Sequence, residues 1–208
     1  MKRIQSVVLL VALGLVLAVS PVFADSPAVT FDNLTGEMLG NGPFTLGWEF
    51  TVNTPIMVSA LGVFDDNQDG LVESHDVGIW NSTGALVVSG TVASGTVDPL
   101  TDQFRYVSAS ALLTPGNYDI GAVWVDGADP NLFPGDVTGF ATIPQITFLQ
   151  NGFAAGATLT NPVNTDSPMP SYFGPNFQAG AVVPEPSSIL LMGTLLLGVS
   201  GLLKRKLR

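Results

Sequence analysis

Residues 44–52 read Phe44-Thr45-Leu46-Gly47-Trp48-Glu49-Phe50-Thr51-Val52, in which large apolar residues alternate with small or polar ones. Successive side chains of a β-strand point to opposite faces of its sheet, so this period of two predicts a strand with one buried face. Pro55 follows and ends the run, because proline cannot donate a ladder hydrogen bond.

Further short runs rich in β-branched and aromatic residues lie at Ile56 to Phe64, Val77 to Trp80, Leu86 to Ala93, Phe104 to Ala109 and Tyr118 to Val125. Turn-forming residues separate them, at Asn81-Ser82-Thr83-Gly84, Asp98-Pro99 and Pro115-Gly116-Asn117. This spacing predicts an all-β fold, an antiparallel, jelly-roll-like β-sandwich. We expect proline-rich rim loops at Asp126 to Asp136 and Asn161 to Pro175, and entry into a final strand at Tyr172 to Phe177.

The amino terminus has the three parts of a secretory signal peptide. Lys2 and Arg3 precede an apolar stretch from Val7 to Val19, and Pro21-Val22-Phe23-Ala24 supplies a small-residue cleavage site. We therefore predict a signal peptide at residues 1–24, cut after Ala24, and an exported domain at residues 25–180. The alternative is an amino-terminal anchor that is retained.

The carboxyl terminus, residues 181–208, has the parts of a membrane anchor. Pro184, Glu185 and Pro186 precede an apolar run from Ile189 to Leu203, and Lys204-Arg205-Lys206-Leu207-Arg208 follows. As a helix the 15-residue run would extend about 22 Å at roughly 1.5 Å per residue, short of a hydrocarbon core of about 30 Å. The basic cluster compensates, because Lys and Arg beside an apolar helix stay on the cytoplasmic side. We predict a single transmembrane helix, with everything before Ser187 outside.

The order of motif, short apolar helix and basic tail resembles the PEP-CTERM sorting signal of exported bacterial proteins. The resemblance covers about one eighth of the chain. It implies that the tail holds the protein in the membrane until an exosortase, a membrane-embedded processing enzyme, acts near Pro184, Glu185 and Pro186. It also implies a Gram-negative bacterium and a role at the cell surface or in an extracellular polysaccharide matrix. What it implies is delivery and processing, not activity.

Charge is distributed unevenly between the terminal segments and the exported region. Six of the seven basic residues lie in the terminal segments, so Arg105 is the one basic residue of the exported domain against 16 of the 17 Asp and Glu, and the remaining acid is Glu185 of the tail motif. Such an acidic surface repels phosphate, which excludes nucleic acid as a partner, and it attracts cations. The chain has no cysteine, so packing or a bound metal must stabilise it in place of disulfides.

The stretch from Asp65 to Asp76 has the spacing of a calcium-binding loop of the EF-hand or dockerin type, which it resembles. Oxygen ligands would come from Asp65, Asn67, Asp69 and Asp76, from the Leu71 carbonyl, and from Glu73 through a water molecule. The loop departs from that family because strands are expected on both sides and its twelfth residue is Asp instead of Glu. The prediction is a Ca²⁺ site, and the alternative is a solvated acidic hairpin loop.

Catalytic motifs are weak in this sequence. His75 is the sole histidine, and its neighbours Ser74 and Asp76 say little about side-chain geometry, so we expect a loop histidine without an enzymatic role. Sequence motifs for a nucleophile elbow, a zinc helix or a phosphate loop are absent, and paired carboxylates are unavoidable among 17 acids. Four aromatic residues could form a sugar-binding platform, although a core position is favoured. These are Trp80, Trp124, Tyr172 and Phe177.

Together these features predict an exported, non-enzymatic structural or adhesive protein of the cell surface or of an exopolysaccharide matrix, processed by an exosortase. A carbohydrate-binding module is the first alternative, and a secreted hydrolase is the second.

Overall fold

The computed structural model describes residues 25–34, 42–132, 137–165 and 172–182, all of which belong to one compact unit, Ala24–Val182. The predicted signal peptide and the predicted tail helix lie outside the described residues. Within the described ranges, no helix is long and apolar enough to cross a membrane.

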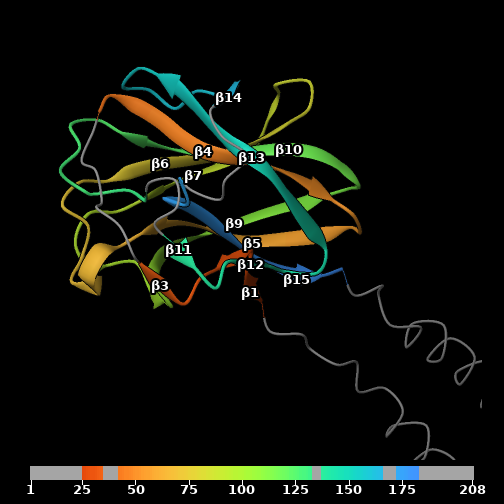
Figure 1. The fold of residues 1–208 in the computed structure, drawn as a ribbon, viewed down its shortest axis with the longest axis horizontal. Helices are drawn as coiled ribbons and strands as arrows, with labels where there is room; N and C mark the ends of the chain where they lie inside the picture. Colours follow the sequence, from red (N-terminus) through yellow and green to blue (C-terminus); the bar gives the residue numbers. More distant parts are fainter. Residues whose placement is uncertain (1–24, 35–41, 133–136, 166–171, 183–208) are drawn as a thin grey trace, which may run out of the picture. The chain divides into compact units, whose positions relative to one another are not determined.

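Two antiparallel sheets form the layers of the molecule (Figure 1). One sheet has the strand order β14-β13-β4-β10-β6-β7, and the other has the order β1-β15-β5-β9-β8. The first comprises β4 (Phe44–Val52), β6 (His75–Asn81), β7 (Leu86–Val92), β10 (Gly116–Trp124), β13 (Ile146–Ala155) and β14 (Asn164–Thr165). The second comprises β1 (Ser26–Pro27), β5 (Ile56–Phe64), β8 (Leu100–Thr101), β9 (Phe104–Leu113) and β15 (Pro175–Ala181).

Short elements complete the described fold. Two small ladders pair β2 (Val29–Thr30) with β12 (Ala141–Thr142), and β3 (Asn33–Leu34) with β11 (Val137–Thr138). A 3₁₀ turn, η1 (Asp66–Gln68), follows β5. The chain changes sheet between β4 and β5, between β5 and β6, between β7 and β8, and between β9 and β10, so both sheets are built from strands that lie apart in the sequence. The predicted all-β antiparallel sandwich is therefore confirmed.

The alternation in residues 44–52 produces the core. Trp48 and Phe50 of β4 are fully buried and pack against Phe177 of β15, which belongs to the facing sheet. The ring centroids of Trp48 and Phe177 lie 6.0 Å apart, and those of Phe50 and Phe177 lie 5.2 Å apart. Full burial of one such side chain contributes about 1.5–3 kcal/mol of transfer free energy. The Trp48 indole N–H donates to the Pro175 carbonyl at 2.9 Å, so its polar atom is satisfied.

Two elements differ from the sequence-based expectation. Strand β13 was not predicted, because a register shift between Phe148 and Gln150 interrupts its alternation and Gly152 lies in its middle. The segment 158–163, of which only the part from Asn161 was expected in a rim loop, crosses the outer face of the six-stranded sheet. Thr45 donates to the Thr158 carbonyl at 3.4 Å and accepts from the Thr160 N–H at 3.2 Å.

A row of glycines makes room for that crossing segment. Gly121 of β10 pairs with Gly47 of β4 and with Gly78 of β6, and Gly152 of β13 pairs with Gly47, so four glycines lie side by side across four strands. A Cβ atom at Gly121 or Gly152 would meet Pro162, and one at Gly78 would meet Leu159. The glycines are therefore a packing requirement of this face of the sheet.

Candidate functional site

The acidic loop begins at a buried ion pair. Asp65, which follows β5, is 1% exposed, and its carboxylate accepts the Arg105 Nε–H at 2.6 Å and the Gly70 N–H at 3.1 Å. The remaining Arg105 nitrogens donate to the carbonyls of Asp98, at 3.0 Å, and Gln68, at 3.3 Å. The first predicted calcium ligand is thus neutralised by the one basic residue of the exported region.

The middle of the loop is held by backbone geometry. Asn67 and Gln68 both have a φ of 62°, a left-handed conformation that Asn tolerates well, and the Asn67 amide donates to Asp66 at 2.8 Å. Asp69 is exposed. Leu71 is buried and forms an isolated bridge with Gly95, so its carbonyl accepts the Gly95 N–H at 2.6 Å.

The last predicted ligand lies in a strand. Asp76 is the second residue of β6, and its carboxylate accepts the Thr91 hydroxyl at 2.6 Å across the ladder to β7. Asp65, Leu71, Glu73 and Asp76 therefore all accept hydrogen bonds from protein groups. Calcium binding by this loop stays a prediction.

The structure brings one member of that set, Glu73, to a different cluster. Its ligand atom, one of His75 and one of Asp129 lie within 4.8 Å of one another, the one such acid–histidine group found among the described residues. His75 is fully buried, and its Nε2 lies 2.9 Å from Asp129 Oδ2. Its Nδ1 lies 2.7 Å from the Val123 carbonyl oxygen. Sequence reasoning missed Asp129, which stands 54 residues from His75 in a predicted rim loop.

Asp129 also closes the end of the acidic loop. Its two carboxylate oxygens accept the N–H groups of Val72, at 2.8 Å, and Glu73, at 2.9 Å. Burial by itself would raise the pKa of Asp129. The hydrogen bonds from His75, Val72 and Glu73 outweigh burial, so the pKa lies below its usual range. The carboxylate is therefore ionised at neutral pH.

Neighbouring residues around His75 do not form a Ser-His-Asp arrangement. His75 is fully buried and Asp76 is exposed, as expected for successive residues of a strand. The aromatic residues considered for a sugar platform are also buried: Trp80 is 5% exposed, Tyr172 is 8% exposed, and Trp124 and Phe177 are fully buried. Trp124, Tyr172 and Phe177 belong to the core cluster, in agreement with the favoured interpretation. Trp80 is instead buried on the outer face of the six-stranded sheet, beside Asp119 and Gly78.

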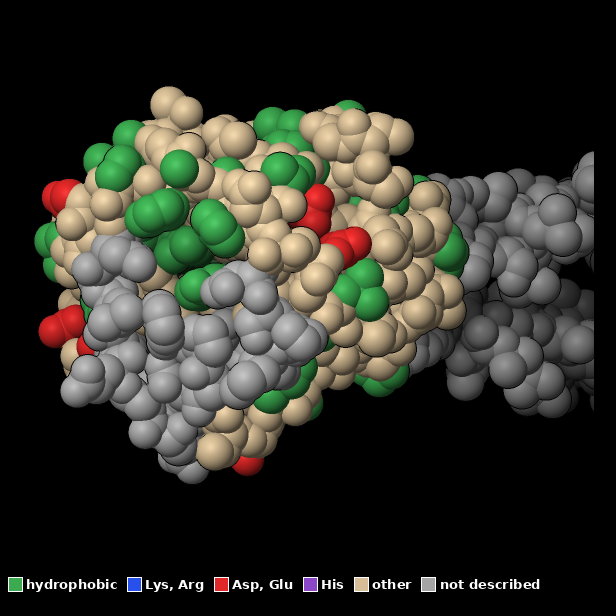
Figure 2. Space-filling view, turned by 45° about the horizontal axis from the view of Figure 1, so that its top comes forward, with side chains coloured by type: hydrophobic (Ala, Val, Ile, Leu, Met, Phe, Trp, Pro, Cys, Tyr) green, Lys and Arg blue, Asp and Glu red, His purple; other side chains and the backbone are tan. Residues whose placement is uncertain are grey.

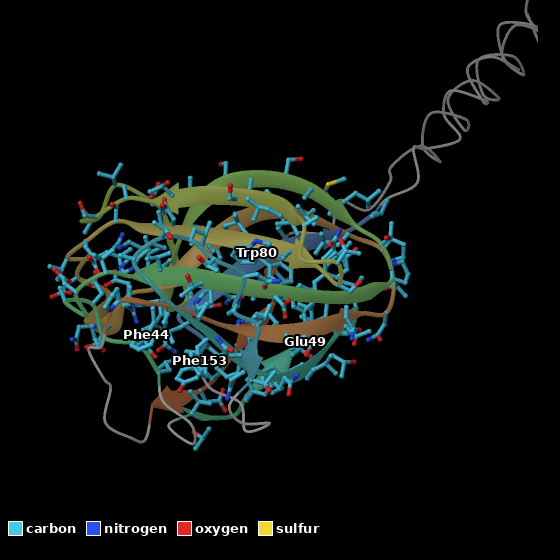
Figure 3. The ribbon with its side chains drawn as sticks, turned by 90° about the horizontal axis from the view of Figure 1, so that it is seen from above. Phe44, Glu49, Trp80 and Phe153 are labelled. Atoms are coloured by element: carbon cyan, nitrogen blue, oxygen red, sulfur yellow. The ribbon has the colours of Figure 1, made fainter. Side chains whose placement is uncertain are left out.

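A pair of carboxylates lies on the outer face of the six-stranded sheet. Asp119 of β10 pairs with Glu49 of β4 on one side and with Trp80 of β6 on the other; Figure 3, which looks onto this sheet, labels Glu49 and Trp80. The Glu49 carboxylate accepts from the side-chain amides of Gln150, at 2.7 Å, and Asn117, at 3.3 Å. Burial raises the pKa of Asp119 to about 6, a hydrogen bond with Asn161 opposes that rise, and the charge of Glu49 adds to it.

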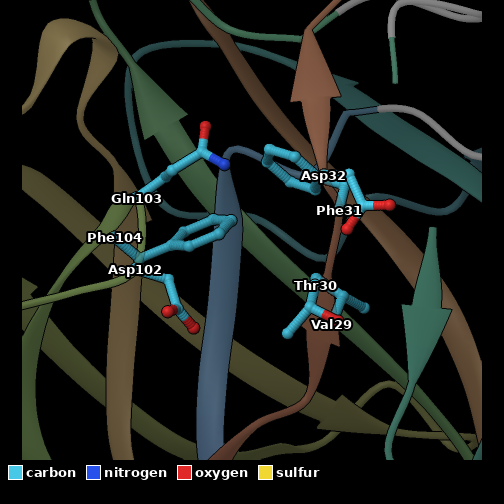
Figure 4. A pocket seen from close by; sticks show the side chains of 7 residues that line it. All are labelled: Val29, Thr30, Phe31, Asp32, Asp102, Gln103 and Phe104. Carbon is cyan, nitrogen blue, oxygen red and sulfur yellow. The ribbon is translucent and has the colours of Figure 1, made fainter. Parts of the chain in front are cut away.

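A pocket of about 320 Å³ lies between the amino-terminal segment and the turn that joins β8 to β9 (Figure 4). Its polar lining comprises two carboxylates, Asp32 and Asp102, with Thr30 and Gln103; Val29, Phe31 and Phe104 supply the apolar lining. The lining holds no basic residue and no histidine. The charged groups of this lining are therefore both acidic.

The surface of the described region carries acids without compensating bases. Arg105, the one Lys or Arg among the described residues, is 4% exposed. Accordingly, the face drawn in Figure 2 shows acidic and hydrophobic side chains and no basic one in the described part.

Comparison with known families places the carboxyl-terminal end of the chain in a defined class. The model of the PEP-CTERM protein-sorting motif matches residues 182–206, which include Pro184, Glu185 and Pro186. With the β-sandwich, this match defines an exported, membrane-anchored protein that an exosortase processes. The tail fits a transmembrane segment. The chain thus combines a PEP-CTERM sorting motif with a β-sandwich domain; no curated protein matches it.

Proposed function

We propose that the β-sandwich is a non-enzymatic structural or adhesive component of the cell surface or of an extracellular polysaccharide matrix. Calcium, bound by the acidic loop, and matrix polysaccharide are the partners included in this proposal. Delivery by the sorting tail supports it, because the tail places the domain outside the cell.

The observation that carries the proposal is the uncharged edge of the six-stranded sheet. Strand β7 (Leu86–Val92) is the last strand in its order and contains neither a charged residue nor a proline. From Val88 to Val92 its register with β6 is uninterrupted. Soluble proteins usually protect such edges with lysine, proline or very short strands, because the unpaired backbone groups can add a strand from another chain. Strand addition would join copies of the domain outside the cell.

The placement of Arg105 and His75 also favours a non-enzymatic role. Arg105 and His75 each form an internal pair with a buried carboxylate, at 2.6 Å and 2.9 Å. Neither is directed at an open site where it could stabilise negative charge on a substrate.

The test places a charge on this edge. Ser89 of β7 and Ser94, which lies outside the strand, are both exposed and both precede Gly-Thr-Val, so Ser89→Glu and Ser94→Glu are matched variants. We expect Ser89→Glu to reduce self-association of the full chain at least about tenfold in sedimentation, and to reduce aggregation of cells that display it. Ser94→Glu should behave as wild type. Equal association of both variants and the wild type would contradict edge pairing.

A carbohydrate-binding module is the second candidate, and the polar row on the outer sheet face favours it. Glu49, held by two amide side chains beside Asp119, offers acceptors and donors of the kind that bind sugar hydroxyls. Glycan arrays with wild type and Glu49→Gln distinguish the roles. Binding lost in the variant without turnover would support this module, whereas product release lost in the variant would indicate a hydrolase.

A further inference from the structure

The hydrogen bonds of His75 leave one ring nitrogen directed at negative charge. The Val123 carbonyl can only accept, so Nδ1 carries a proton and donates it across 2.7 Å. The lone pair of a neutral ring would then lie on Nε2, 2.9 Å from the Asp129 carboxylate. Two acceptors at this distance repel each other, so either a proton on Nε2, donated to Asp129, or a metal ion beside the two atoms must relieve the repulsion.

We propose that Glu73, His75 and Asp129 bind one divalent transition-metal ion of the Zn²⁺ type. Their ligand atoms already lie within 4.8 Å of one another. In zinc sites with bonds of about 2.0–2.2 Å, neighbouring ligand atoms lie roughly 3.0–3.5 Å apart. The separation of 2.9 Å between His75 and Asp129 is close to that range, so the ion requires only small side-chain shifts.

The surrounding hydrogen bonds orient two of the ligands as metal sites require. A metal-binding histidine usually donates its other ring N–H to a carbonyl or carboxylate, which sets the tautomer and turns the free nitrogen toward the ion. Val123 does this for His75. The backbone N–H groups of Val72 and Glu73 hold Asp129, and these bonds leave further lone pairs on its carboxylate.

Glu73 supplies the adjustable ligand and the open side of the site. Its side chain is partly exposed, and the carboxylate accepts only a long hydrogen bond from Val125, at 3.3 Å. The side chain can therefore turn toward the ion at small cost. Water can complete the coordination on the solvent side, whereas His75 and Asp129 close the interior side.

The ligand set selects the class of metal. Imidazole nitrogen suits Zn²⁺ and other first-row transition ions, whereas Ca²⁺ and Mg²⁺ prefer oxygen ligands only. The proposed site, with one histidine and two carboxylates, therefore favours a different metal from the oxygen-only calcium loop predicted between Asp65 and Asp76. An ion here would join the end of the acidic loop to the loop that follows β10.

Direct binding is the first measurement. The full chain, purified in detergent with a tag that contains no histidine, is stripped with a chelator and titrated with Zn²⁺ in a calorimeter. We expect one Zn²⁺ per chain, with no displacement by excess Ca²⁺. Because the chain has a single histidine, ¹⁵N spectra of its ring report the site alone. The Nε2 resonance should change from a protonated to a metal-bound nitrogen.

A second readout comes from Trp124. Its ring centroid lies 5.1 Å from that of His75, close enough for Co²⁺ in the site to quench its fluorescence. Loss of this quenching in a variant reports the loss of the metal independently of any activity.

Variants assign the ligands. Glu73→Gln changes a partly exposed side chain and should fold normally, and we expect it to weaken Zn²⁺ binding at least about tenfold. His75→Gln should abolish binding, with folding checked by circular dichroism. Asp69→Asn, an exposed acid of the same loop, is the control and should bind as wild type.

Two results would overturn the assignment. The first is that Zn²⁺ does not bind in a 1:1 ratio and both ring nitrogens carry protons. His75 and Asp129 then form an imidazolium–carboxylate ion pair, in which the proton on Nε2 takes the place of the metal ion. Binding that survives Glu73→Gln unchanged would show that the three residues do not act together.

Discussion

At the scale of single residues, Arg105 and His75 determine the conformation of the acidic loop. Arg105 pairs with Asp65 where the loop begins, and His75 pairs with Asp129 where it ends. Removing one partner of a buried ion pair typically costs about 3–5 kcal/mol, because it leaves an uncompensated charge. Arg105, the one basic residue of the described region, is therefore used for architecture among residues that otherwise carry acids.

Asp119 provides a prediction about pH. Its pKa is about 6 in the folded chain and about 3.9 when unfolded, so the folded state binds more protons between these values. Stability contributed by the protonated acid is therefore lost as pH rises from about 4 through about 6. Asp119→Asn should remove this loss.

We expect Asp119→Asn to raise stability at pH 8 by about 1 kcal/mol, a value reduced from the full shift because the side chain is only half-buried. At pH 4 the difference should nearly disappear. Urea unfolding at both pH values measures it, with Asp76→Asn, which changes an exposed acid of β6, as the control. A gain that is equal at pH 4 and pH 8 would disprove the titration argument.

At the scale of elements, local pattern predicted some strands well and others not at all. Strands β4 and β5 span the predicted residues, because their alternation and flanking Pro55 are local features. Strand β13 escaped prediction because its bulge shifts the period. The position of Thr158–Val163 could not be predicted either, since it depends on glycines that meet only when four strands are in register.

The acidic loop gives the prediction that belongs to this scale. If the loop binds Ca²⁺ through its exposed oxygens, the ion would stabilise the folded chain by about 2.7 kcal/mol at a hundredfold excess over Kd. For a domain of this size that is roughly 5–10 °C in Tm. Asp69→Ala should remove the shift.

Calorimetric melting of wild type and Asp69→Ala in Ca²⁺ and in Mg²⁺, at equal ionic strength, separates binding from general screening of the acidic surface. The loop is a solvated turn if Mg²⁺ stabilises as well as Ca²⁺.

At the scale of the whole molecule, the chain combines a β-sandwich with the sorting motif at residues 182–206. The sorting motif lies in the tail, so we expect membrane retention to depend on the tail. Deleting Ile189 to Arg208 should release the domain into the medium without a membrane-held stage. Fractionation of cells that express the truncated and the complete chain measures this, and equal membrane retention of the two would refute the role given to the tail.

The sequence by itself determined the class of fold, the destination and the acidic character of this protein. Alternation in residues 44–52, the order of parts around Pro184 and the counts of acids and bases are all properties of neighbouring residues or of composition. Only the tertiary structure decided that the side chains of Glu73, His75 and Asp129 lie close together, and that Asp65 forms an ion pair with Arg105. The reason is physical: these partners are joined by sheet register and by side-chain burial, which place residues 40 and 54 positions apart in contact and leave no periodic trace in the chain.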